Sequence, residues 1–184
     1  HEGVRNATKK ALQTAKDAGA IISFDPNLRF PLWASSEDAR AQTMYGLEYC
    51  DILKISDNEL IWLTGEEDYT DGVHWINEKF DIPLILVSMG KTGSRAYYHG
   101  KMTEVEAFIQ PGTIETTGAG DTFCACILHY VLEHGLNKLS EDELHEMLVF
   151  ANAAASIITT RKGALRVMPE VEEIQELMKS GKKS

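Results

Sequence analysis

The sequence predicts an α/β fold in which helices flank a mainly parallel β-sheet. Segments with helical periodicity alternate with short, continuously apolar runs, and such runs are typical of strands that a parallel sheet buries on both faces. The chain has 184 residues, enough for one domain with a sizeable core. Because no repeat, low-complexity tract or linker-like stretch interrupts it, we expect a single α/β domain over residues 1–184.

The first part of the chain predicts two helix–strand units and the start of a third helix. Gly19 is the expected C-terminal cap of the first helix, and the first strand ends abruptly at Asp25-Pro26-Asn27. A helix start is expected at Ser56. The predicted elements are a helix over 4–18, a strand buried on both faces over 20–24, a helix over 37–48 and a strand over 51–55.

The rest of the chain continues the alternation and then adds a hairpin. Turn signals at Lys91-Thr92-Gly93 and at His99-Gly100 separate its strands. Ser140 and Glu143 have the spacing of a capping box that opens a long Ala-rich helix. The predicted elements are a helix over 72–80, a buried strand over 83–88, antiparallel strands over 94–98 and 102–108, and helices over 124–131, 140–158 and 170–178.

Composition excludes several classes of function. The formal net charge of -10 argues against a broad basic surface for nucleic acid or anionic lipid. The longest apolar runs fall far short of the roughly 20 residues that span a bilayer. Three cysteines, without paired metal-ligand spacing, suggest neither disulfides nor a zinc site. We expect a cytoplasmic protein, and we expect a native polypeptide longer than this chain, which starts without Met and enters a helical pattern at once.

The strongest chemical signal is a glycine-rich turn, Thr116-Thr117-Gly118-Ala119-Gly120-Asp121, between a strand and an amphipathic helix. Small residues let the backbone approach a ligand closely, and a helix start presents free N–H groups and partial positive charge. Such a turn is suited to an anion. The alternative is that Asp121 only caps the helix and the glycines only make a tight turn.

This turn, together with Phe123, resembles the second signature of the PfkB carbohydrate kinases, the ribokinase-like family. Further stretches match the family in the same order: Phe24 to Arg29, Lys54 to Glu59, Val87 to Gly93 and Arg161 to Ala164. The resemblance implies a Rossmann-like, ribokinase-like fold. It covers the family's C-terminal half, so the N-terminal half and the lid, with most sugar contacts, are expected to be missing from this chain.

The resemblance also implies roles for individual residues. Asp121 would be the catalytic base, and the amides of Gly118, Ala119, Gly120 and Asp121 the anion hole for the migrating phosphoryl group. The implied nucleotide-binding residues are Ser88, Gly90, Gly93, Thr117 and Asn152. The implied substrate-binding residues are Asn27 and Arg29. Glu59 would organise Mg²⁺ through water, and Thr117, Arg161 and Gly163 would lie near a potassium-like ion.

Plainer interpretations stand beside these roles. Ser88 to Gly93 could be an ordinary hairpin turn, Asn152 a helix-surface residue, and the segment of Asn27 and Arg29 a strand-exit loop. Ser56 replaces the family's Asn, and Ser56 with Glu59 also fits a capping box. Glu115 replaces the family's Asp, which puts cation activation in doubt.

The implied function is ATP-dependent phosphorylation of a sugar hydroxyl, with ATP, Mg²⁺ and K⁺ as the implied cofactors. Arg29-Phe30-Pro31-Leu32-Trp33 looks most like fructokinases, with 2-keto-3-deoxygluconate kinase or ribokinase as alternatives. A non-catalytic nucleotide-binding regulatory module is the alternative from a different class. Family members often dimerise through lid strands, which this sequence lacks, so the sequence leaves the oligomeric state open, with a homodimer through the missing lid as one option.

Overall fold

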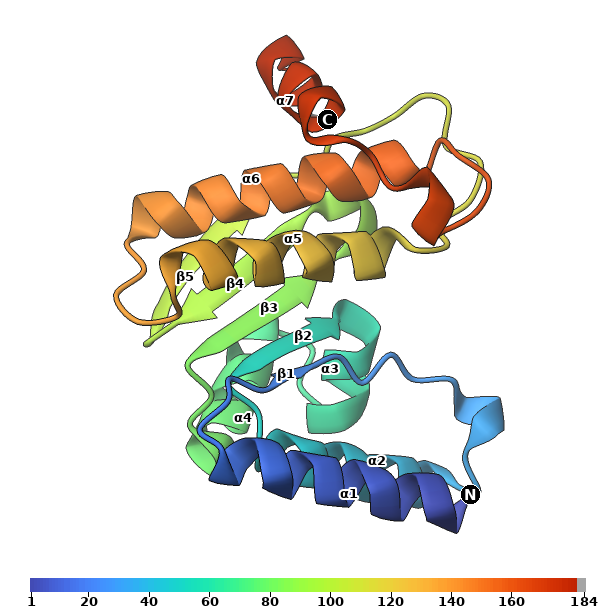
Figure 1. The fold of residues 1–184 in the computed structure, drawn as a ribbon, viewed down its shortest axis with the longest axis vertical. Helices are drawn as coiled ribbons and strands as arrows, with labels where there is room; N and C mark the ends of the chain where they lie inside the picture. The colour runs from blue at the N-terminus through green and yellow to red at the C-terminus, as the bar shows by residue number, and fades with distance from the viewer. Residues whose placement is uncertain (182–184) are drawn as a thin grey trace. The chain divides into compact units, whose positions relative to one another are not determined.

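A computed structural model describes residues 1–181 of the chain. The chain divides into two compact units, His1–Val87 and Ser88–Ser184, whereas the sequence predicts one domain. Helices alternate with or flank strands in both units, and strand pairing is parallel between β1 and β2 but antiparallel between β4 and β5 (Figure 1). Within the described part of the chain, no helix has both the length and the apolarity to cross a membrane.

The first unit alternates helices with strands. Its elements are α1 (Glu2–Asp17), β1 (Ser23–Phe24), the 3-10 helix η1 (Phe30–Leu32), α2 (Ser36–Leu47), β2 (Ile52–Ser56), α3 (Asp57–Thr64), α4 (Tyr69–Phe80) and β3 (Leu84–Ser88), whose last residue opens the second unit. The strands lie in the order β1-β2-β3. Ser23 pairs with Ile52 and Phe24 with Leu53. The predicted helices and strands of this part are confirmed to within a few residues, apart from the first strand.

The core of the first unit forms around β2 and β3. Leu84, Ile85, Leu86 and Val87 are all 0 % exposed, as are Ile52, Leu53 and Ile55 on the neighbouring strand. Burial of consecutive residues means that both faces of these strands are covered. The predicted buried strand over 83–88 is confirmed as β3, and β2 is buried in the same way.

The same prediction is wrong for the first strand. Only two residues of the predicted segment 20–24 are in β1, and Ile21 is 53 % exposed while Ile22 is buried. Among the described residues β1 pairs with β2 alone, so it is an edge strand. A continuous apolar run does not reveal how many neighbours a strand has.

Helix α1 lies beside α2 through polar and aromatic contacts (Figure 1). Arg5 forms an ion pair with Asp38 at 2.7 Å, and the ammonium of Lys9 lies 4.7 Å from the centroid of the Tyr45 ring. No residue of α1 is buried, and Val4 is 67 % exposed. The helical periodicity of this segment thus predicted the helix but not the burial of its apolar face.

The second unit contains a hairpin and three packed helices. Its elements are the 3-10 helix η2 (Gly90–Thr92), β4 (Ser94–Tyr98), β5 (Lys101–Val105), α5 (Ala119–His134), α6 (Glu141–Ile158), the 3-10 helix η3 (Leu165–Val167) and α7 (Val171–Ser180). The hairpin turn is His99-Gly100, with positive φ at both residues, as two-residue hairpin turns of type I′ require. The strand predicted over 102–108 runs instead over Lys101–Val105.

Helix α6 is the centre of the second unit. It packs against α5, α7, β4 and β5, and α5 runs alongside it (Figure 1). Ala153 and Ala154 are 0 % exposed and cluster with Phe108 of the loop after β5 and Ile174 of α7. The Ser140–Glu143 capping box is present at its start. Small residues on this helix allow close packing, which confirms the predicted Ala-rich buried helix.

Candidate active site

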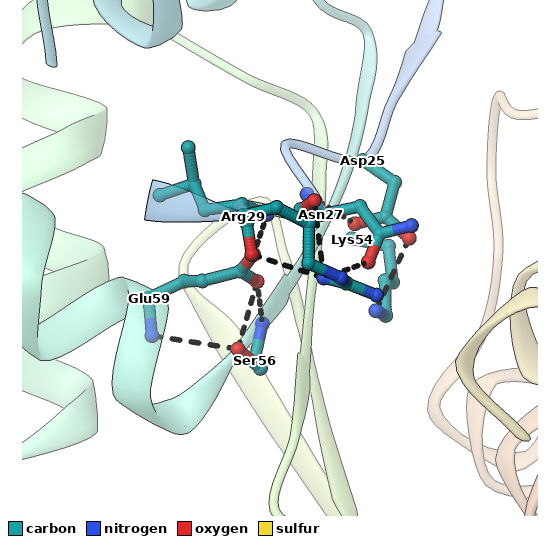
Figure 2. Close-up of polar contacts among 7 residues, drawn as sticks. Asp25, Asn27, Arg29, Lys54, Ser56 and Glu59 are labelled. Atoms are coloured by element: carbon teal, nitrogen blue, oxygen red, sulfur yellow. Dashed lines mark hydrogen bonds and ion pairs between the residues drawn. The ribbon is translucent and has the colours of Figure 1, made fainter. Parts of the chain in front are cut away.

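A small cavity lies where β1 and β2 of the first unit end. It has a volume of about 260 Å³ and is lined by Asn27, Leu28, Arg29, Phe30, Lys54, Ser56, Asn58 and Glu59. Ligands of open α/β sheets gather at the carboxyl ends of parallel strands. The structure therefore brings three residues predicted from the sequence, Asn27, Arg29 and Glu59, to one cavity of that type (Figure 2).

The loop after β1 is held in a bent conformation by its own polar groups. The amide of Asn27 donates to Asp25 Oδ1 at 3.1 Å, and Asn27 has a φ of 44°, in the left-handed region. Arg29 Nη1 donates to Asn27 Oδ1 and to Leu28 O, both at 2.9 Å. This folding back places the Arg29 guanidinium beside the Asn27 side chain at the cavity (Figure 2).

A largely buried ion pair connects this loop to β2. Lys54 Nζ lies 3.1 Å from Asp25 Oδ2, and the two side chains are 7 % and 18 % exposed. Burial raises the pKa of the Asp25 carboxyl, and the nearby Lys54 ammonium works in the opposite direction. Lys54 is the charged residue of the otherwise apolar run Ile52-Leu53-Lys54-Ile55, and charged side chains are buried almost only when paired.

Glu59 connects the loop after β1 to the start of α3. Its Oε2 accepts from the Ser56 amide at 3.0 Å and from Ser56 Oγ at 2.7 Å, which is the predicted capping box. Its Oε1 accepts from the amide of Leu28 at 2.6 Å. A carboxylate offers about four acceptor positions. Glu59 therefore keeps room for one more donor, such as a water molecule of a hydrated cation.

No cluster of three or more His, Cys, Asp or Glu side chains that could hold a metal occurs among residues 1–181. Mg²⁺ in phosphoryl-transfer sites is typically bound through one or two carboxylates, water and substrate phosphates rather than by an all-protein cage. Glu59, with its one remaining acceptor position, fits such an arrangement. Its role toward Mg²⁺ stays a prediction.

A second, larger cavity of about 590 Å³ lies in the same unit, between α1, α2 and the segment after β1. Leu12, Phe24, Trp33 and Tyr45 contribute to its walls, so much of its lining is apolar or aromatic. Asn27 and Arg29 line this cavity as well. Arg5, Asp38 and Gln42 also line the larger cavity, whereas Lys54, Ser56 and Glu59 line only the smaller one.

In the second unit, the predicted glycine turn forms the start of α5. Gly118 is the N-cap residue with a φ of 80°, and no side chain caps this helix start. The Ala119 amide donates to Thr116 O at 3.2 Å, and the Thr122 amide donates to Gly118 O at 2.8 Å. Asp121 lies exposed in the first helical turn. Of the four amides predicted to hold an anion, that of Ala119 is thus engaged within the turn.

Close packing explains why glycine occupies position 118. A Cβ atom there would lie 3.2 Å from Ile158 Cδ1 and 3.4 Å from Ala164 Cβ. Left-handed φ adds strain for any other residue. The end of α6 and the segment after it therefore pack directly against the turn.

The residues from Ser88 to Gly93 make a tight turn between β3 and β4. The Met89 amide donates to Gly93 O at 2.8 Å, and Gly90 to Thr92 form η2. Gly93 has a φ of 116°, and a Cβ atom there would lie 2.1 Å from Val105 O. The turn is thus confirmed as a local structure, whereas contact of Ser88, Gly90 or Gly93 with ATP phosphates stays a prediction.

Asn152 is buried, not on the helix surface. Its Nδ2 donates to Val105 O at 3.1 Å and to Glu106 O at 3.3 Å, and its Oδ1 accepts from Ser94 Oγ at 3.0 Å. The side chain thereby connects α6 to both strands of the hairpin. These contacts correct the surface interpretation, and its predicted place near adenine is untested.

The segment around Arg161 and Gly163 meets Glu115, which lies in the loop between β5 and α5 and not, as the sequence predicts, beside a strand. The Gly163 amide donates to Glu115 Oε1 at 2.9 Å, so the Glu that replaces the family's Asp binds backbone. Arg161 donates to Val167 O at 3.1 Å and is paired with Glu173 of α7. Thr117 is exposed close by in sequence. The structure thus joins Glu115 to the predicted cation loop, and a bound cation stays a prediction.

Sequence reasoning did not assign roles to Asp25 and Lys54. The signal that could have identified them is the single charge inside a buried strand, which requires a partner. The other half of the signal is the Asp that ends the preceding strand. Adjacent parallel strands place their ends together, so the two charges were natural partners.

Comparison with known proteins agrees with this architecture. Residues 1–171 match the family described as pfkB family carbohydrate kinase. The chain is 38 % identical over 178 residues to Probable fructokinase-4 of Arabidopsis thaliana, covering 97 % of this chain and 54 % of that protein. The chain thus spans about half the length of the curated relatives it matches.

Two solved structures show the same fold. A fructokinase double mutant from Vibrio cholerae, solved with fructose, ADP and a potassium ion, has a TM-score of 0.83 and 27 % identity over 95 % of this chain and 55 % of its own. A fructokinase from Xylella fastidiosa with bound ATP has a TM-score of 0.83 and 25 % identity over 96 % of this chain and 57 % of its own. With the family match covering most of the sequence, the chain belongs to the pfkB family of carbohydrate kinases.

Proposed function

We propose that the protein transfers the terminal phosphoryl group of ATP to a hydroxyl of fructose. The observation that carries the proposal is similarity along almost the whole chain to fructokinases, including one solved with fructose and ADP. The cavity of Asn27, Arg29 and Glu59 supports it, because amide, guanidinium and carboxylate groups suit a polyhydroxy ligand. We further propose that the protein acts in the cytoplasm.

In the proposed reaction, Asp121 accepts the proton of the attacking hydroxyl. The oxygen of that hydroxyl then bonds to the γ-phosphorus of ATP, the bond from this phosphorus to the bridging oxygen breaks, and ADP leaves. Free amides at the start of α5 stabilise the transferred group, since phosphoryl transfer depends mainly on positioning and charge stabilisation. The exposure of Asp121 in the first helical turn is compatible with this role.

The remaining predicted residues take supporting roles in the proposal. Ser88, Gly90, Gly93, Thr117 and Asn152 would contribute to the nucleotide site. Asn27 and Arg29 would contact the sugar, and Glu59 would hold Mg²⁺ through water. Mg²⁺ supplies charge neutralisation of the phosphates when bound. K⁺ near Thr117, Arg161 and Gly163 would be an activator.

A second candidate substrate is an acidic sugar such as 2-keto-3-deoxygluconate. Two cationic side chains, Arg29 and Lys54, line the smaller cavity, and an Arg fork binds carboxylates well. The carboxylates of Asp25 and Glu59 partly balance the charges of these two cations, so the uncharged sugar fructose fits the cavity better than an acidic one. Ribose is the third candidate.

The test is a panel of sugars assayed with the purified protein and MgATP. ADP release would be followed by a coupled assay, and the phosphorylated product by mass spectrometry. We expect fructose to give the highest kcat/KM, and removal of Mg²⁺ by EDTA to abolish turnover. ADP or ATP binding by calorimetry without phosphorylation of any sugar would contradict the proposal and favour a nucleotide-binding regulatory module.

A further inference from the structure

We propose that the Asp25–Lys54 ion pair positions the loop Asp25 to Arg29, so that Lys54 is a further residue on which sugar binding depends. The inference rests on the proposed function, because it gives that loop the role of contacting the sugar. The sequence assigns neither residue a role, although Lys54 lines the cavity proposed for the sugar. Lys54 acts in this proposal through Asp25 and is a positioning residue.

Burial is the first observation behind the proposal. The Lys54 side chain is 7 % exposed in a strand whose neighbours Leu53 and Ile55 are 0 % exposed. A rigid, buried strand is a fixed support for its ammonium group. A buried charge that loses its partner is strongly destabilised, so the pair constrains both residues to meet.

The two oxygens of Asp25 transmit this constraint to the loop. Oδ2 lies 3.1 Å from Lys54 Nζ, while Oδ1 accepts from the Asn27 amide at 3.1 Å. The carboxylate thus joins β2 to the residue with left-handed φ. Asn tolerates left-handed backbone better than most residues other than glycine, and the hydrogen bond from its amide to Asp25 Oδ1 holds it in this conformation.

Glu59 supplies the second attachment of the same loop. It accepts from the Leu28 amide at 2.6 Å while its other oxygen binds Ser56. Between these two attachments, Arg29 Nη1 donates to Asn27 Oδ1 and to the Leu28 carbonyl (Figure 2). The orientation of the Asn27 amide and of the Arg29 guanidinium at the cavity therefore depends on both carboxylates being held in place.

The decisive variants separate positioning from stability. Lys54→Met leaves Asp25 without its cation, Lys54→Arg keeps a cation, and the double variant Asp25→Asn/Lys54→Met leaves no lone charge. We expect Lys54→Met to raise the KM for fructose about tenfold or more while kcat changes by less than about threefold, because loss of uniform binding raises KM alone. Lys54→Arg restores KM to within about threefold of the wild-type value.

The double variant is the sharpest test. Neutral partners are tolerated in place of a buried ion pair, so its Tm returns toward the wild-type Tm. Its KM stays raised, because no ionic contact fixes the loop. A KM that returns together with Tm would show that the pair only stabilises the fold and would overturn the proposal, as would an unchanged KM in Lys54→Met. Lys10→Met, at an exposed position on α1, is the control and should change neither quantity.

Hydrogen exchange keeps this proposal separate from the proposed function. We expect the amides of Asn27 and Leu28 to exchange faster in Lys54→Met than in the wild-type protein, measured with the purified protein in the absence of sugar. Unchanged exchange at these amides would overturn the positioning role. Failure of the wild-type protein to phosphorylate any sugar would overturn the proposed function while leaving the exchange result to decide the loop's attachment.

Discussion

Single side chains set the local geometry of both candidate ligand sites, and each does so through a small number of contacts. In the first unit, the carboxylates of Asp25 and Glu59 bind backbone amides of the loop that carries Asn27 and Arg29. In the second unit, Gly93 allows backbone of β5 to approach where a Cβ atom would collide, and Gly118 lets the side chains of Ile158 and Ala164 pack closely. The chemistry of the proposed reaction, in contrast, falls on Asp121.

Asp121 gives the first residue-scale prediction. Asp121→Asn keeps the shape of the side chain but removes the proposed base, so we expect kcat for sugar phosphorylation to fall about 10²- to 10⁴-fold. The Tm should change little, because the side chain is exposed. Steady-state kinetics of the purified variant measure the effect. Unchanged turnover would exclude Asp121 as the base.

Gly93 gives the second prediction at the scale of residues. In Gly93→Ala the new Cβ atom would lie 2.1 Å from the backbone oxygen of Val105, so the hairpin must shift in addition to bearing a left-handed residue. Gly100 is a matched control, with a φ of 79° and open space where a Cβ atom would lie. We expect Gly100→Ala to lose about 1–2 kcal/mol of unfolding free energy and Gly93→Ala clearly more. Unfolding monitored by circular dichroism measures both losses. Equal losses of unfolding free energy in the two variants would contradict the packing argument.

At the scale of elements, hydrogen bonds at helix starts fix where several helices begin. Ser56 with Glu59, Ser140 with Glu143 and Glu170 with Glu173 each form a reciprocal capping box. Capping satisfies amides that a helix cannot pair internally. Helix α5 differs, because no side chain caps its start. Helix α1 also starts without a side-chain cap, so this feature is not specific to α5. At α5 it leaves amide donors that the proposed phosphoryl site would use.

The last helix gives an element-scale prediction on pH. The hydrogen bond from Arg161, and then that from the Glu170 amide, lower the pKa of Glu173 below its ordinary value of 4.5. The unfolded state therefore binds more protons just below pH 4.5, so the stabilising contribution is present above this pH and is lost as pH falls through the lowered pKa.

The measurement is the slope of unfolding free energy against pH between about 3 and 5. We expect Glu173→Gln to flatten that slope relative to the wild-type protein. Glu176, a residue of α7 for which no contact with Arg161 occurs among the described residues, offers the matched control Glu176→Gln. A wild-type slope in Glu173→Gln would show that its contacts are lost in solution.

The core decides stability at the scale of the whole molecule, and each compact unit has its own. The first unit buries β2 and β3, while the second buries α6 against α5, α7 and the hairpin. All three tryptophans of the chain, Trp33, Trp62 and Trp75, belong to the first unit. Their fluorescence therefore reports the unfolding of that unit alone.

Leu86→Ala gives the prediction at this scale. Leu86 is 0 % exposed in β3, so we expect a loss of about 2–5 kcal/mol from removed contacts and a residual cavity. Leu32, 83 % exposed in the same unit, is the control, and Leu32→Ala should stay within about 0.5 kcal/mol. Urea unfolding followed by tryptophan fluorescence compares the two. Similar losses would contradict the assignment of β3 to the core.

Much of the fold was predictable because its signals are local. The hairpin turn at His99-Gly100, the capping boxes at Ser56 and Ser140 and the apolar run of β3 each depend on residues adjacent in sequence. The strand predicted at 20–24 failed because burial depends on the number of neighbouring strands, which no local pattern encodes. Burial of a helix likewise depends on which elements cover it, and α1 has no buried residue, with Val4 exposed and Leu12 half-buried.

The candidate site also has one part that the sequence predicts and another that only the structure reveals. The sequence predicts roles for Asn27, Arg29, Glu59 and the Gly118–Asp121 turn, because these residues stand in recognisable order beside strand ends and a helix start, and these roles stay predictions. Only the tertiary structure showed that Asp25 meets Lys54, that Glu59 binds the Leu28 amide, and that Asn152 connects α6 to the hairpin. These contacts join residues between 29 and 47 positions apart, and such pairings arise from how strands and helices pack, so no short sequence pattern could determine them.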